Sequence, residues 1–215
     1  MNKWIDKKSF IALLKDGMHI MVGGFLTCGT PEPLIDWIVE SQVKDLTIIC
    51  NDAGYPEKGV GKLLLHHQVK KLIVTHIGTN PNAGKLMSEK EIEVELIPQG
   101  TFVEQIRAYA GRLGGILSPT GIHTPVEEGK EIITIKGVPY ILSEPIGADL
   151  ALICAYQSDE KGNLIYKGSA RNFNPTMAMA GDTVIACVEK RVQDIDPEHV
   201  ITPHPFIDYL VEVSS

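Results

Sequence analysis

Short apolar runs alternate with amphipathic segments along most of this 215-residue chain. The runs are rich in β-branched residues and have the length of buried strands, whereas the segments between them repeat apolar positions at helical spacing. The predicted strands cover residues 20–22, 46–50, 71–75, 92–97, 150–154 and 183–188. The predicted helices cover residues 6–14, 31–39, 61–67, 85–90 and 102–108. This alternation predicts an α/β fold with an open, mostly parallel sheet and helices on both faces.

Residues 110–145 interrupt the alternation. This segment is rich in Gly, Pro and Thr and holds short strand candidates at 132–136 and 140–142. We therefore expect a β-rich excursion from the main sheet and not a separate domain. Because the chain is long enough for one well-packed core, we expect a single domain over residues 1–215.

Composition and charge narrow the class of protein. Hydrophobic residues make up 44% of the chain and charged residues 22%, as in globular proteins. A net charge of −7 argues against nucleic acid or an anionic membrane as the main partner. No apolar run approaches the roughly 18 residues of a membrane span, and the N-terminus lacks a signal-peptide pattern. We therefore expect a cytoplasmic protein.

The four cysteines are widely spaced, without a C-x-x-C pair, so neither a metal site nor a disulfide framework is expected. Cys50, Cys154 and Cys187 lie in or beside apolar runs, as small core residues do. Cys28 lies in a glycine-rich loop, but no general base is near it in the sequence, which disfavours a nucleophilic role.

The run from Asp16 to Pro31 is the most informative segment of the chain. A short strand is followed by Gly23 and Gly24, which lack a Cβ and let the backbone approach a ligand closely. Pro31 suits the first turn of a helix, and the free N–H groups of such a turn attract anions. The segment therefore predicts a strand, a ligand-binding loop and a helix.

Two further turns follow predicted strands, at Asn51 and at Gln99. In open parallel sheets, ligands bind beyond the carboxyl ends of the strands. If the strands are parallel neighbours, the loop at Gly23 and these two turns lie on one edge of the sheet. We expect them to form a single cleft.

The run 16–31 and several later motifs resemble the α subunits of family I coenzyme A transferases. The later motifs are Gly100-Thr101 with Glu104 and Ile106-Arg107, Gly114-Gly115, Ser118 to Gly121, Ala148 to Leu152, Gly162 to Leu164, and Ala170 to Pro175. They occur in family order from about Lys3 to Val211. Within the family, the chain looks most similar to bacterial acetate/butyrate–acetoacetate CoA-transferase subunits.

The resemblance implies a reaction in which CoA moves between a short-chain acyl-CoA and a carboxylic acid through a glutamyl-CoA thioester. In the family that glutamate belongs to the β subunit, in a turn that this sequence lacks. Glu144 is the nearest candidate here, at a position where α subunits carry an ordinary glutamate. The implied assembly is α₂β₂, with this chain inactive alone. CoA is a co-substrate, and no metal or prosthetic group is implied.

The resemblance also assigns roles to residues. Gln99 matches a glutamine that helps to stabilise the oxyanion, although a turn glutamine bonded to nearby backbone is the alternative. Residues expected to bind CoA or substrate are Gly23, Gly24, Phe25, Leu26, Thr27, Cys28, Gly29 and Asn51. Structural turns are the alternative for these residues, because glycine and asparagine are common in turns.

Three further residues, His123, Asn172 and Asn174, are expected at the subunit interface or the pocket. The asparagines have helix capping as the alternative. His123 and His204 stand where many family members have glycine, so either residue affects substrate choice if it lines the acyl pocket; a surface-loop substitution is the alternative.

Other enzyme classes fit less well. The loop spacing is not that of a nicotinamide-binding G-x-G-x-x-G motif, and residues 78–86 do not match a phosphate-binding P-loop. Two alternatives stay open: a CoA-transferase for another acid such as 3-oxoadipate, and a sugar-phosphate isomerase-like enzyme of related fold.

Overall fold

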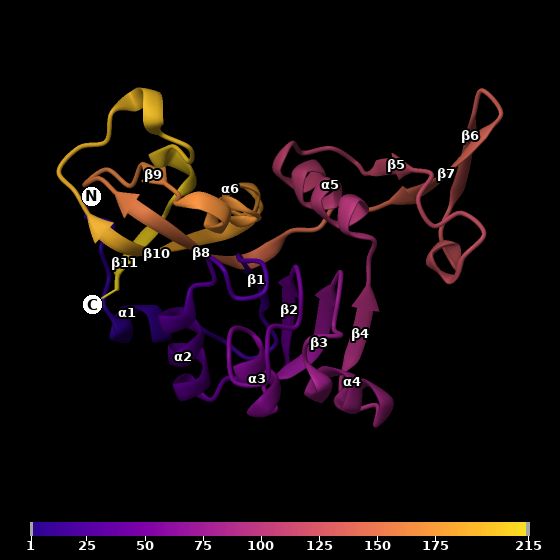
Figure 1. Cartoon of the computed structure of the whole chain (residues 1–215), viewed down its shortest axis with the longest axis horizontal. Helices are drawn as coiled ribbons and strands as arrows, with labels where there is room; N and C mark the ends of the chain where they lie inside the picture. Colours follow the sequence, from indigo (N-terminus) through magenta and orange to yellow (C-terminus); the bar gives the residue numbers. More distant parts are fainter. Residues whose placement is uncertain (1, 214–215) are drawn as a thin grey trace.

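A computed structural model describes residues 2–213 (Figure 1). Its main sheet has eight strands, seven of them in the order β11-β10-β8-β1-β2-β3-β4 with every neighbouring pair parallel. These strands are β1 (His19–Val22), β2 (Leu46–Cys50), β3 (Val69–Val74), β4 (Glu93–Leu96), β8 (Ala148–Ser158), β10 (Gly181–Arg191) and β11 (Tyr209–Glu212). The eighth strand, β9 (Leu164–Ile165), pairs antiparallel with β8. The predicted parallel sheet is confirmed.

Helices cover both faces of the sheet, as predicted. The helices of one face are α1 (Lys7–Ile11), α2 (Glu32–Ser41), α3 (Gly61–Leu65) and α4 (Pro81–Ser88). On the other face, α5 (Gln99–Ala110) and α6 (Asn174–Met177) pack against a second core cluster. Among residues 2–213, no helix is both long and apolar enough to cross a membrane.

Successive side chains along one strand point to opposite faces of the sheet and so pack into the two different core clusters. In β1, Ile20 and Val22 contact the first cluster and Met21 the second. All three side chains are buried, which explains the continuous apolar run in the sequence. The carboxyl end of β1 is therefore held from both faces, and the glycine loop begins there.

The β-rich excursion is confirmed as a second, three-stranded antiparallel sheet of order β5-β7-β6. Its strands are β5 (Ile116–Ser118), β6 (Ile132–Ile135) and β7 (Val138–Ser143), and we call residues 112–147 the arm. The arm follows α5 and returns to the main sheet through β8. Figure 1 shows it projecting sideways from the end of α5.

The structure differs from the sequence-based prediction mainly at element ends. Strands β8 and β10 each have 11 residues, about twice the predicted lengths, because their last residues are polar and pair through the backbone. The pattern did not indicate β5, β9 or β11. Within residues 2–213, four short 3₁₀ helices also occur, at Pro125–Glu127, Gly168–Arg171, Pro197–His199 and His204–Phe206.

Candidate active site at the carboxyl edge of the sheet

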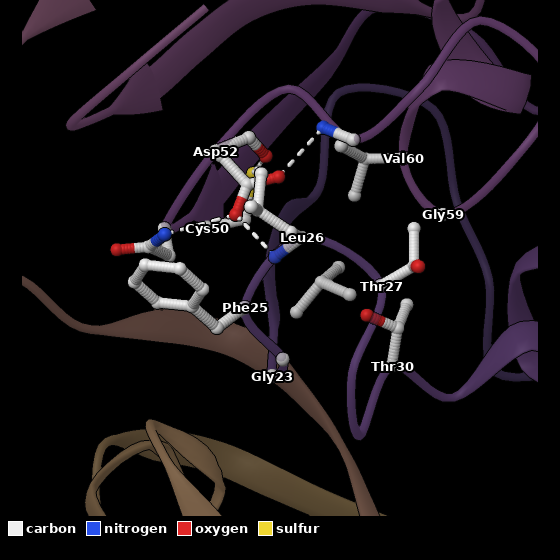
Figure 2. A pocket seen from close by; sticks show the side chains of 13 residues that line it. Gly23, Phe25, Leu26, Thr27, Thr30, Cys50, Asp52, Gly59 and Val60 are labelled. Atoms are coloured by element: carbon white, nitrogen blue, oxygen red, sulfur yellow. Dashed lines mark hydrogen bonds between the residues drawn. The ribbon is translucent and has the colours of Figure 1, made fainter. Parts of the chain in front are cut away.

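The loops after β1 and β2 meet in a small hollow at the carboxyl ends of the strands (Figure 2). The hollow is lined by residues 22–27, 30, 50–52, 54, 59 and 60. Its enclosed volume is only about 10 Å³, enough for about one water molecule. A larger hollow of about 610 Å³ lies elsewhere, between the segments 159–163 and 194–203, and holds none of the predicted site residues. The smaller hollow, which most of the predicted binding residues line, is therefore the candidate active site.

The two glycines that open the loop are required by their surroundings. A Cβ on Gly23 would lie 1.9 Å from Oδ1 of Asn174, so a side chain is excluded there. Gly24 has φ +118°, and a Cβ would lie 2.2 Å from Oγ1 of Thr30. The glycines thus allow the loop to lie directly against Asn174 and the start of α2.

Leu26 and Thr27, at the tip of the loop, have φ +47° and +75°. Residues other than glycine rarely adopt a backbone with positive φ, and a β-branched residue such as Thr is strained there. The flanking residues stabilise the conformation, because Phe25 and Cys28 exchange two backbone hydrogen bonds of 3.1 and 2.9 Å. The loop is therefore fixed in shape before any ligand binds.

Asp52 ties this loop to the turn after β2. Its Oδ2 accepts hydrogen bonds from the N–H of Leu26 at 2.8 Å and from Nδ2 of Asn51 at 2.9 Å, and its Oδ1 accepts from the N–H of Gly54 at 2.9 Å (Figure 2). The carboxylate is buried, with 6% of the residue exposed. Sequence reasoning did not assign Asp52 to the site. The available signal was an Asn-Asp-x-Gly turn directly after a buried strand, which is equally typical of ordinary turns.

Gln99 and Asn51 are brought together, as predicted for turns on one sheet edge. Nε2 of Gln99 donates to Oδ1 of Asn51 at 3.0 Å, and Oγ1 of Thr75 donates to the carbonyl of Asn51 at 2.9 Å. Gln99 is exposed and is the first residue of α5, whereas Asn51 is buried with its amide directed to Asp52. The bonds form one chain from α5 through Asn51 and Asp52 to the glycine loop.

Asn172 and Asn174 support the same loop from a segment more than 140 residues away in sequence. Nδ2 of Asn174 donates to the carbonyl of Gly29 at 2.9 Å, and Nδ2 of Asn172 donates to the carbonyl of Cys28 at 2.9 Å. Asn174 has no exposed surface in this chain. Both residues therefore act here by holding the glycine loop, and contact of Asn172 with a partner stays a prediction.

Of the remaining predicted residues, Phe25 lines the hollow and is 40% exposed (Figure 2). Cys28 is exposed and does not line the hollow, and its Sγ lies 3.3 Å from Oγ of Ser169. His123 lies in the arm, is exposed and does not line the hollow. His204 lies in a 3₁₀ helix near the C-terminal strand, also outside the hollow.

The other thiols behave as core groups. Burial raises the pKa of the Cys50 thiol well above its ordinary value, and burial also raises the pKa of Cys154 to about 12. Both are therefore protonated at neutral pH, and neither is a ready nucleophile. Within residues 2–213, no group of three or more His, Cys, Asp or Glu side chains is placed to hold a metal ion.

Comparison with known proteins gives close relatives. A family model described as "Coenzyme A transferase" matches residues 7–213. The chain is 50% identical over 213 residues to the acetoacetyl-CoA:acetate/butyrate CoA transferase alpha subunit of Clostridium acetobutylicum, covering 98% of both chains. It is 47% identical over 199 residues to the acetate CoA-transferase subunit alpha of Escherichia coli K12, covering 92% of this chain and 90% of the relative.

A solved structure shares the fold. The acyl-CoA transferase apoenzyme of Escherichia coli O157:H7 matches with a TM-score of 0.87 and 21% identity, covering 99% of this chain. The match covers 47% of that protein, so this chain spans about half of its length. The likeness extends over both the main sheet and the arm.

Proposed function

This chain belongs to the coenzyme A transferase family, as its motifs indicated, and from that premise we propose that it forms one half of an active site completed by a β-type subunit. Its relatives at 47–50% identity are named α subunits. The proposed substrates are a short-chain acyl-CoA and a carboxylic acid of the acetoacetate, acetate and butyrate class.

In the proposed reaction, a glutamate carboxylate of the β-type subunit attacks the thioester carbon of the acyl-CoA. The C–S bond breaks, CoA leaves as a thiolate and a mixed anhydride forms. The thiolate then attacks the glutamyl carbonyl carbon and releases the first acid, which leaves a glutamyl-CoA thioester. The acceptor acid reverses these steps, and no net proton is consumed. Each step passes through an oxyanion that needs preorganised donors.

The observation that carries the proposal is that the Asp52 carboxylate is already fully engaged in hydrogen bonds within this chain. Among the described residues that line the hollow, Asp52 is the only carboxylate, and three N–H donors already engage it. A carboxylate committed in this way is a poor nucleophile, because attack would break the bonds that hold the loop. Glu144 does not line the hollow. We therefore assign the nucleophile to the partner chain.

We assign the oxyanion donors to this chain. Gly24 and Thr27 line the hollow, and within residues 2–213 their backbone N–H groups have no acceptor. Such free donors on a rigid loop suit a developing negative charge. Gln99 does not line the hollow itself, but its amide bonds to Asn51, which does, and we propose that it adds a further donor there. CoA lies above the hollow in this proposal, because the enclosed space is far smaller than a ligand pocket of several hundred Å³.

The identity of the acid substrate rests only on the names of the relatives. Acetoacetate with acetate or butyrate is preferred, because those substrates appear in the names of the relatives at 47–50% identity. Transfer to another acid such as 3-oxoadipate is the remaining alternative. Membership of the transferase family argues against the isomerase-like alternative.

Intact mass spectrometry tests the mechanism. The co-purified pair is incubated with acetoacetyl-CoA in the absence of an acceptor acid, and the mass of each chain is recorded. The proposal expects one CoA added to the β-type chain, lost again on addition of acetate, and no addition to this chain. A CoA adduct on this chain, or turnover without any adduct, would contradict the proposed division of roles.

A further inference from the structure

The arm presents one face made entirely of apolar side chains. Pairing of β7 with β5 and β6 places Leu117 opposite Leu142, Ile133 opposite Tyr140, and Ile135 opposite Val138. Directly opposed residues share a face, and alternate residues of one strand also share it. The apolar arm face therefore consists of Leu117, Ile133, Ile135, Val138, Tyr140 and Leu142. Within the three strands, no position on this face is polar or charged apart from the Tyr140 hydroxyl.

The opposite face of the arm is packed around Ile141, although Ile132 on that same face is 42% exposed. Ile141 lies there and is buried, with 1% of its surface exposed. Val126, from the connection between β5 and β6, lies close to Gly121 together with Ile141. An antiparallel sheet with one packed face normally turns a polar face to water. Here the second face is apolar as well.

The apolar arm face is open in this chain. Val138 is 45% exposed, Ile135 44% and Leu117 38%, while the other three residues are half-buried. None of the six belongs to either core cluster of the described residues. The six side chains therefore form one contiguous, partly exposed apolar face.

The size of the face limits what covers it. Three strands about 4.8 Å apart, each with about four residues at about 3.3 Å, span roughly 200 Å². A stable interface needs about 800 Å² per partner, so two arms packed face to face would not hold a dimer of this chain by themselves. The arm face must be part of a larger contact.

The position of the arm indicates where that contact continues. Helix α5 starts with Gln99 at the carboxyl edge of the sheet and ends where the arm begins, and β7 returns to β8, which pairs with β1. Figure 1 shows α5 and the arm on the side toward which β2, β3 and β4 point. A chain that closes over the glycine loop and extends past α5 would reach the arm.

We propose that the apolar arm face is a docking surface for an apolar part of the β-type subunit, continuous with the contact that completes the active site. This inference rests on the proposed function, because that function requires a second chain at this edge. It assigns the arm to holding the partner chain and not to chemistry.

The test measures binding of the co-expressed and separated β-type chain of the same organism by sedimentation. Val138→Lys and, independently, Leu117→Lys place a charge on the arm face. Met87→Lys is the matched control, because Met87 is 40% exposed but lies on α4, which packs on the face of the main sheet opposite α5. We expect the dissociation constant to rise at least 100-fold for both arm variants, as for a charge placed in a hot spot, and to change less than about twofold for the control. Thermal melting of the lone variants confirms that they fold.

Each result has a defined meaning. Wild-type binding by both arm variants would overturn the arm inference. Loss of self-association of this chain, with unchanged binding of the β-type chain, would overturn it in favour of a second copy. A complex that depends on the arm but transfers no CoA would support the arm inference and reject the proposed function. If the two chains do not associate at all, both are rejected.

Discussion

The glycine loop and the arm both depart from the regular parallel sheet, but opposite interactions hold them. The loop is fixed by directional hydrogen bonds within this chain: Asp52 accepts one from the loop, and Asn172 and Asn174 each donate one to it. The arm is held by backbone pairing and by apolar packing on one face, and its other face is left open. The loop is thus complete in shape before binding, whereas the arm leaves an apolar face exposed.

This difference separates two tasks that one active site requires. Oxyanion stabilisation needs donors whose positions do not change during the reaction, and buried hydrogen bonds provide such rigidity. Holding a partner needs apolar area, which is non-directional and tolerates small shifts. Variants in the loop should therefore affect turnover, and variants in the arm should affect assembly. The following experiments sharpen or break that division.

Gly23→Ala should have the largest effect on turnover. The added Cβ overlaps Oδ1 of Asn174, so the loop and the segment that supports it must move apart. We expect kcat of the assembled pair to fall on the order of 1000-fold and the free energy of unfolding to fall by about 1–3 kcal/mol. Gly84→Ala is the control, because nothing lies within 4 Å of its added Cβ. Steady-state kinetics and denaturant titration measure both effects, and a fully active Gly23→Ala variant would show that the loop position is unimportant.

Asp52→Asn should be next. The introduced amide N–H₂ would face one of the N–H donors that now bind the carboxylate, leaving buried donors unpaired. We expect kcat to fall between about 100- and 1000-fold while the Kd for the β-type chain stays within about threefold. Asp149→Asn is a matched control, since Asp149 accepts the backbone N–H of His19 at 2.8 Å in an exposed position. Equal losses in both variants would mean that Asp52 only contributes stability.

Gln99→Ala should lower kcat on the order of 100-fold, the effect of losing one oxyanion donor. Because Gln99 is exposed, the free energy of unfolding should change by less than about 0.5 kcal/mol. Comparison of kcat with KM for acetoacetyl-CoA provides the measurement. Undiminished kcat would remove Gln99 from the mechanism and leave it as a support for Asn51.

A stability measurement, without any expected effect on turnover chemistry, should distinguish the two faces of the arm in the lone chain. Ile141→Ala removes a buried side chain and should lower local stability by about 2–4 kcal/mol, detected as faster amide exchange in β6 and β7. Val138→Ala, on the apolar arm face, should change it by less than about 0.5 kcal/mol. Similar effects at the two positions would mean that the lone chain already covers both faces.

Sequence reasoning reached the parallel sheet and the shared edge because both depend on local signals. Apolar runs indicate strands, and the rule for carboxyl ends brings Asn51 and Gln99 together without any knowledge of contacts. The family motifs added the class of chemistry, which the comparisons confirm at the level of the family.

What the sequence did not indicate depends on tertiary contacts. The bonds from Asn172 and Asn174 to the loop join positions about 145 residues apart, and neither residue type signals a distant partner. In the sequence, Asp52 is indistinguishable from an ordinary turn residue, because only the structure shows that its Oδ2 accepts the N–H of Leu26. The apolar arm face depends on the register of β5, a strand that the pattern did not predict.

The most direct test of the central claim is a transfer assay with acetoacetyl-CoA and acetate. This chain, the β-type chain and the co-purified pair are assayed separately at equal concentrations. The half-site account predicts acetyl-CoA formation by the pair and none above background by either chain alone. Transfer by this chain alone would contradict the account, because it would place the nucleophile among residues that the account assigns to support and oxyanion binding.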